Sequence, residues 1–189
     1  MTYSMDWILT GLATIVVFVL PLCSSQTDCL DAYDCALSSV QNTVGDEDIN
    51  CYGWNSCRQA TKIEKSSSGY INCYGGYSCY KATSITTTTS QGVRCDGLYS
   101  CANIKKKIES STADIYCFGE LSCYGSKIDG DIACFGDRSC SNIIAYEASG
   151  SIDGYRAFEN SIAYMVNGGV FEMDATQAGY GLSIICSKD

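Results

Sequence analysis

Cysteine is the residue type in this chain with the most evident chemistry, because its 14 copies are regularly spaced. Six C-x5-C pairs recur, namely Cys29 and Cys35, Cys51 and Cys57, Cys73 and Cys79, Cys95 and Cys101, Cys117 and Cys123, and Cys134 and Cys140. This density of thiols favours disulfide bonds in an oxidising compartment, since cytosolic thiols are kept reduced. Zinc is a weaker explanation, because the spacing exceeds the usual gap between paired zinc ligands and the chain has no His.

The spacing leaves two pairing schemes open. Within a phrase such as Cys51–Cys57, five intervening residues and a Gly corner allow the thiols to approach, but equivalent cysteines of stacked repeats would also lie within reach. We expect pairing within each phrase, because every first cysteine brings its own second one. Cys186 is then unpaired once Cys23 leaves with a leader. An odd cysteine of this kind is expected to form an intermolecular bridge or to be a reactive thiol. The alternative is a small buried residue that continues the cysteine column, because Ile184 precedes Cys186 as an isoleucine precedes the cysteine in the repeats.

Carboxylates are a second candidate for chemistry, because pairs of them hydrolyse glycosidic bonds. Glu120 and Asp137 occupy matching positions in adjacent repeats, but Arg138 lies alongside and favours an ion pair. The acidic segments 46–48 and 129–131 lack the spacing of a calcium-binding loop and are expected to be turns. With no His and no nucleophile motif, the chain is not expected to be an enzyme, and no metal or cofactor is predicted.

The elements that carry the cysteines recur with a fixed period. The first cysteines of successive pairs are 22 residues apart up to Cys117, and the next follows after 17 residues. A β-branched residue stands two positions before five of them, at Ile49, Ile71, Val93, Ile115 and Ile132. This alternation is typical of a strand with one buried face, and the Gly two residues after the cysteine suits a tight bend. The pattern predicts an all-β fold, a parallel β-helix (solenoid) with disulfide-stapled coils of about 22 residues.

The start of the chain is consistent with export. Residues 1–25 contain an apolar run from Trp7 to Leu22 and are expected to be a cleaved signal peptide, so a secreted protein with no membrane segment after cleavage is predicted. A retained signal anchor is the alternative, because residues 1–6 contain no Lys or Arg. The formal net charge of −9 argues against a nucleic-acid partner, and the basic cluster 105–107 is expected to be a solvated turn.

One domain is expected over 26–189. Regular repeats should occupy 27–145, and irregular coils with a cap should occupy 146–189. In the irregular part, Ile152 is expected to open a coil in which Gly154 replaces the cysteine.

An exposed aromatic column is the main candidate for a binding surface. If Ile49 and Cys51 face inward, the next residue faces outward in every coil, and in five coils it is aromatic: Tyr52, Tyr74, Phe118, Phe135 and Tyr155. Asp96 interrupts this column. A contiguous aromatic stripe suggests contact with sugar rings or with a second copy of the chain, unless the tail or neighbouring side chains cover it.

The phrase C-x-G-x-x-S-C, followed by Ala60 or Ala82, resembles the cysteine-rich repeats of secreted β-solenoid proteins of protists and algae. It is similar, more loosely, to the C-x5-C-x-x-A coil of insect hyperactive antifreeze proteins. Over residues 27–145 the resemblance implies a solenoid whose two cysteines in each coil are bridged to each other. The insect coil is shorter and carries a threonine ladder, whereas threonines cluster here only at Thr83 and 86–89, so no ice-binding plane is predicted.

Together these features predict a secreted, extracellular structural or adhesive solenoid that self-associates. The first alternative is a glycan-binding module that uses the aromatic column. The second is a small polysaccharide-active enzyme, for which few coils are available to build a cleft.

Overall fold

The computed structural model describes residues 28–42, 45–111, 113–146, 150–152, 156–165, 171–173 and 180–186. The leader expected at 1–25 and residue Tyr155 lie outside these ranges. In the described part the chain forms strands β1 to β16, and no helix there is long and apolar enough to cross a membrane.

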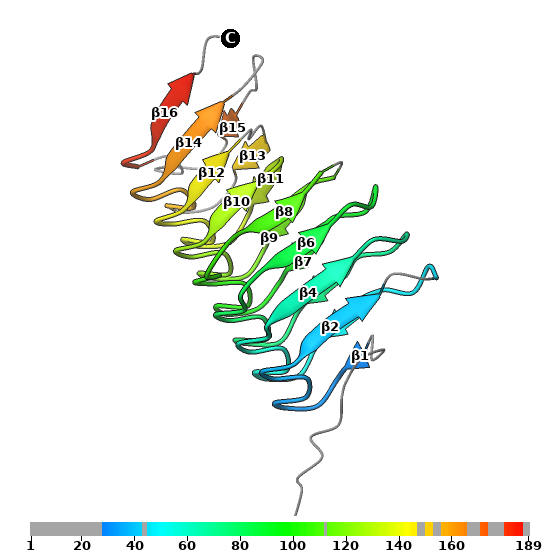
Figure 1. Ribbon diagram of the computed structural model, residues 1–189. Helices are drawn as coiled ribbons and strands as arrows, with labels where there is room; N and C mark the ends of the chain where they lie inside the picture. The colour runs from blue at the N-terminus through cyan, green and yellow to red at the C-terminus, as the bar shows by residue number, and fades with distance from the viewer. Residues whose placement is uncertain are drawn as a thin grey trace, which may run out of the picture.

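Two parallel sheets make up the structure, and successive strands of the chain alternate between them (Figure 1). The first sheet contains β1 (Asp28–Cys29), β3 (Ile49–Cys51), β5 (Ile71–Cys73), β7 (Val93–Cys95), β9 (Ile115–Cys117), β11 (Ile132–Cys134), β13 (Gly150–Ile152) and β15 (Phe171–Met173). The second sheet contains β2 (Ser39–Asn42), β4 (Lys62–Lys65), β6 (Ile85–Thr87), β8 (Ile108–Ser110), β10 (Lys127–Asp129), β12 (Ile144–Tyr146), β14 (Ile162–Met165) and β16 (Ser183–Cys186). Neighbouring strands are parallel throughout, which confirms the predicted parallel β-helix.

Equivalent side chains form columns through the stack because the strands are in register. Ile49 pairs with Ile71 and Cys51 with Cys73, as the repeat predicts. In the second sheet one column of inward-facing apolar residues has no exposed surface, and it consists of Val40, Ile63, Ile85, Ile108, Ile128, Ala145 and Ala163. The core therefore consists of facing columns of β-branched and small side chains, which are well suited to a pleated surface.

Six disulfide bonds lie inside the coils. They join Cys29 to Cys35, Cys51 to Cys57, Cys73 to Cys79, Cys95 to Cys101, Cys117 to Cys123 and Cys134 to Cys140. Their Cα–Cα distances run from 5.7 to 6.1 Å, as usual for cystine. Sulfurs of neighbouring coils are also close, since those of Cys51, Cys73 and Cys79 lie within 4.8 Å of one another. All three cysteines are bonded within their own coils and offer no thiolate to a metal.

The segment around the second cysteine of each coil alternates between two kinds of backbone hydrogen bond. In the third coil the N–H groups of Tyr77, Cys79 and Lys81 donate to carbonyls of the next coil at 2.7–3.0 Å. The intervening N–H groups of Ser78 and Tyr80 donate within the coil instead. Tyr77 and Lys81 both have a φ of 57°, a left-handed conformation that costs an L-residue roughly 1–2 kcal/mol. The hydrogen bonds between coils offset this cost.

The glycine column has a different physical basis from the expected tight bend. None of Gly53, Gly75, Gly97, Gly119 and Gly136 has a positive φ. Instead, the coils approach so closely that a Cβ on Gly97 would lie 2.6 Å from the Tyr74 carbonyl oxygen. Glycine is required here for stacking, because a side chain would separate neighbouring coils.

Two expectations for the irregular coils are wrong in register. Cys134 pairs with Ile152, so Ile152 takes the position of the cysteine rather than that of the isoleucine before it. Cys186 pairs with Met165 in the second sheet, so it does not continue the column of cysteines in the first sheet.

Candidate functional site

The aromatic column follows the carboxyl ends of β3, β5, β9 and β11, where it consists of Tyr52, Tyr74, Phe118 and Phe135. Tyr52, Phe118 and Phe135 are exposed by 42%, 41% and 39%. Tyr52 stacks on Tyr74 and Phe118 on Phe135, each pair with ring centroids 5.0 Å apart. The exposed Asp96 lies between the two pairs. The structure thus brings together four of the five predicted aromatic residues.

Stacking decides which part of each ring is available. The planes of Tyr52 and Tyr74 differ by 4°, and those of Phe118 and Phe135 by 16°. Each ring therefore has one face covered by its partner, and Phe118 also stacks on Tyr116, with ring centroids 5.6 Å apart. Burial, and then the neighbouring phenol of Tyr74, raises the pKa of Tyr52. The Tyr52 phenol is therefore uncharged at physiological pH.

A polar column beside the aromatic column holds the first sheet together from outside. The Asn50 side-chain amide donates to Asp28 at 2.7 Å, and the Asn72 amide donates to Asn50 at 2.9 Å. One coil further, the Arg94 guanidinium lies 3.7 Å from the centre of the Tyr70 ring. These contacts between coils position the strands that carry the aromatic column.

A second aromatic group, the corner cluster, was not predicted from the sequence. It consists of Trp54, Tyr77, Tyr80, Tyr99 and Tyr124, which lie on the turns around the second cysteines. Tyr77 stacks on Tyr99 at 5.2 Å, and Tyr80 meets Tyr77 edge to face at 5.3 Å. The repeat positions could have indicated this cluster. Tyr77 and Tyr99 share one repeat position, and Tyr80 and Tyr124 both follow a second cysteine.

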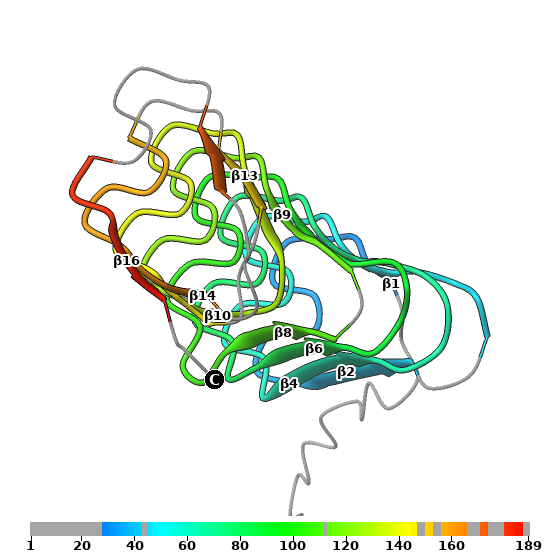
Figure 2. The same cartoon turned by 90° about the horizontal axis from the view of Figure 1, so that it is seen from above.

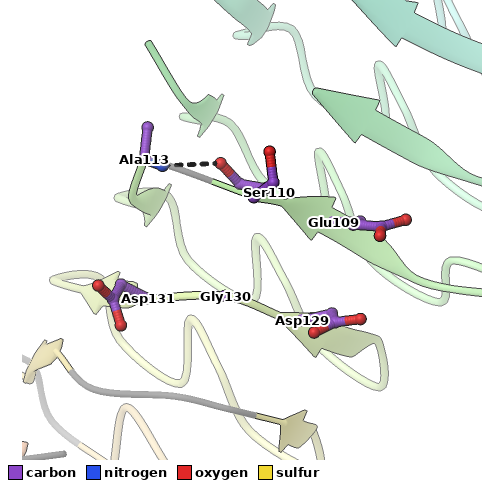
Figure 3. Close-up of a pocket in the computed structure, with 7 residues that line it drawn as sticks. Glu109, Ser110, Ala113, Asp129, Gly130 and Asp131 are labelled. Carbon is purple, nitrogen blue, oxygen red and sulfur yellow. Dashed lines mark hydrogen bonds between the residues drawn. The ribbon is translucent and has the colours of Figure 1, made fainter. Parts of the chain in front are cut away.

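An acidic hollow of about 480 Å³ lies beside the turns that connect the second sheet to the first (Figure 3). The hollow forms where the turn between β8 and β9 is followed, one coil later, by the shorter turn between β10 and β11. The connecting turns of the earlier coils project further from the sheets (Figure 2). Glu109 and Asp129 line the hollow from neighbouring strands. Lys107 pairs with both carboxylates, at 3.1 and 2.7 Å. Because one cation already satisfies these groups, the hollow gives no support for a calcium site.

The carboxylates considered for glycoside hydrolysis are not paired as expected. Glu120 and Asp137 are both exposed. Arg138, expected to pair with them, instead contacts Glu159, with 3.1 Å between Nε and Oε2.

The acidic turn 46–48 has a structural role. The Asp48 carboxylate accepts hydrogen bonds from the Tyr70 backbone N–H at 2.8 Å and from the Asn72 amide at 3.0 Å. The fully buried Lys65 ammonium donates to the Gly45 carbonyl at 3.1 Å. Burial lowers the pKa of Lys65, and the negative charge of Asp48 acts in the opposite direction.

No family model, curated protein or solved structure matches this chain. The class of the protein therefore rests on its own geometry, which is that of a cysteine-rich β-solenoid with disulfide-bonded repeats of about 22 residues. The buried disulfides fit an extracellular protein.

Proposed function

We propose that this chain is a secreted protein with a structural or adhesive role and that its copies associate side by side through the aromatic column. The observation that carries the assignment is the column itself, two stacked pairs of rings on a stack of cross-linked coils, of which Tyr52, Phe118 and Phe135 are exposed and Tyr74 is half-buried. The likeness of its repeats to those of secreted β-solenoid proteins supports the same role.

The disulfides make the surface rigid. Closing a loop as short as that between Cys95 and Cys101 should stabilise the fold by roughly 2 kcal/mol on the loop-entropy model. Every coil from the first to the sixth carries one such bond. Because the cross-linked coils already hold the rings of the aromatic column in place, little conformational entropy is lost when two copies associate. This favours repeated contacts between copies.

Glycan binding by the aromatic column is the weaker of the two uses. A sugar ring packs its apolar C–H face on an aromatic face, but Tyr52 and Tyr74 turn faces toward each other. Edges are better suited to interdigitating with the rings of a second copy. Catalysis is not proposed, since Glu120 and Asp137 form no organised pair.

Sedimentation velocity over a range of concentrations tests self-association. The double variant Tyr52→Ser/Phe118→Ser should weaken association at least tenfold. The matched control is Tyr146→Ser, because Tyr146 is also exposed and stacks on Tyr164 at 5.3 Å, but lies in the second sheet. Higher salt should strengthen association, because it screens repulsion between copies of net charge −9. A wild-type protein that stays monomeric throughout, or equal loss in the control, would contradict the assignment.

A further inference from the structure

A second hollow lies at the corner of the solenoid, next to the corner cluster and away from the aromatic column. It measures about 320 Å³ and is lined by Tyr99, Leu121, Tyr124, Arg138, Ser141, Asn142, Glu159 and Asn160. This corner hollow is at the small end of the range for small-ligand sites. Its chemistry is mixed, with aromatic rings on one side and amide, guanidinium and carboxylate groups on the other.

The preceding coils show what this corner accommodates. The ring of Tyr99 lies between those of Tyr80 and Tyr124, at centroid distances of 6.4 and 6.2 Å and nearly perpendicular to both. The residue between Tyr80 and Tyr124 in their column is the small, buried Ala102. A six-membered ring thus fits at the corner where the column of Tyr80, Ala102 and Tyr124 carries its small residue.

The same arrangement recurs at the corner hollow, but no aromatic ring stands there at the position equivalent to Tyr99. Ser141 is the small, buried residue of the column there, between Tyr124 and Glu159. The position equivalent to Tyr99 holds Leu121 in one coil and Arg138 in the next, and Arg138 is drawn to Glu159. The space that Tyr99 fills in the earlier coil is therefore open beside Tyr124.

The polar side of the hollow offers both donors and acceptors. The Glu159 carboxylate, whose side chain is only 16% exposed, is held by Arg138 at 3.1 Å and by Arg156 at 3.3 Å. On the rim, Asn142 and Asn160 are exposed, and their side-chain amides make no hydrogen bond to any other described residue. Amide groups beside an ordered carboxylate match the paired donor and acceptor character of sugar hydroxyls.

We propose that the corner hollow binds one pyranose ring of a neutral glycan, with an apolar C–H edge of the sugar against Tyr124 and its hydroxyls on Asn142, Asn160 and Glu159. A cation is disfavoured because two arginines already neutralise Glu159. An anionic sugar is disfavoured because the protein carries a net charge of −9. This site is independent of self-association through the aromatic column, which lies on another part of each coil.

Isothermal titration of the disulfide-intact protein with cellohexaose, chitohexaose, laminarihexaose and mannohexaose tests the assignment, with hexagalacturonate as the anionic probe. At least one neutral hexasaccharide should bind saturably, and Tyr124→Ala should weaken it at least tenfold. Asn142→Gly with Asn160→Gly should have a similar effect without backbone strain. Both asparagines have a positive φ, and glycine is native at the equivalent positions Gly125 and Gly181.

Two controls separate this site from other surfaces. Gln59→Gly changes the same left-handed position in a distant coil and should leave affinity within twofold. Tyr52→Ser/Phe118→Ser should also retain binding even if it abolishes self-association. Binding of none of the four neutral probes, binding unchanged by the Tyr124 and Asn variants, or stronger binding of hexagalacturonate would overturn the assignment.

Discussion

Phe158 occupies, one coil later, the position that Cys140 holds as the second cysteine of its own coil. The Cys140 N–H donates to the Ala157 carbonyl, just as the Cys123 N–H donates to that of Ser139, the residue before Cys140. Phe158 has no exposed surface. The stack therefore continues past its last disulfide because one large apolar side chain fills the volume of a cystine.

Truncation of this side chain should be costly. Phe158→Ala should lower the free energy of unfolding by about 3–5 kcal/mol, because the residue is fully buried and the rigid coils cannot collapse into the cavity. Chemical denaturation under non-reducing conditions measures this loss. A loss below about 1 kcal/mol would show that the later coils do not unfold together with the rest.

A column of buried serines precedes the second cysteines, and its hydroxyls have no hydrogen-bond partner among the described residues: Ser56, Ser78, Ser100, Ser122 and Ser139. Ser100→Ala should therefore be neutral or stabilise by up to about 1 kcal/mol. The matched variant is Ser126→Ala, because buried Ser126 accepts from the Ile104 N–H at 3.1 Å and donates to the Cys101 carbonyl at 2.8 Å. It should cost about 1–3 kcal/mol. Thermal unfolding distinguishes the two, and equal losses would contradict the assigned hydrogen bonds.

Glycines of the two kinds should respond differently to substitution. Gly97→Ala should destabilise by more than about 2 kcal/mol, because its Cβ would meet the Tyr74 carbonyl oxygen and separate two coils. Gly125→Asn should change stability by less than about 1 kcal/mol. Gly125 has a φ of 66°, and asparagine is native at equivalent positions such as Asn103 and Asn142. A tolerated Gly97→Ala would contradict the close approach of the coils.

Stability should fall at alkaline pH. Burial, and then the neighbouring phenol of Tyr77, raises the pKa of Tyr99 above its ordinary value of 10.0. Above about pH 10 the folded protein thus retains a proton that the unfolded chain loses, so the free energy of unfolding decreases as pH rises. Tyr99→Phe removes this proton and should reduce the slope between pH 10 and 11, as followed by denaturant titrations. A slope that is unchanged or steeper would contradict the assigned shift.

The fold was predictable from the sequence because two columns determine it. Ile49 and Cys51 alternate as in a strand, and their return every 22 residues requires that like residues stack. The register beyond Cys134 was not predictable in the same way. Once the cysteine is replaced, Ile152 matches either column, and the two alignments are distinguished only by the strand pairing of Ile152 with Cys134.

The candidate surfaces were predictable only where they follow a strand. Tyr52 faces outward because Cys51 faces inward, a consequence of the strand period. Tyr77 and Tyr99 lie instead on turns and have a left-handed backbone themselves, so their side-chain direction does not follow the strand period. The corner hollow depends further on which side chain fills each turn, so it became visible only in three dimensions.

Tryptic peptide mapping of the disulfide-intact protein without reduction tests the pairing within coils most directly. Three tryptic peptides each contain the two cysteines of one coil and no other cysteine, namely residues 66–81, 95–105 and 108–127. We predict that each appears as a single peptide lighter by two hydrogens than its reduced form. Peptides linked across these segments, such as one joining Cys73 to Cys95, would contradict the stack of individually closed coils.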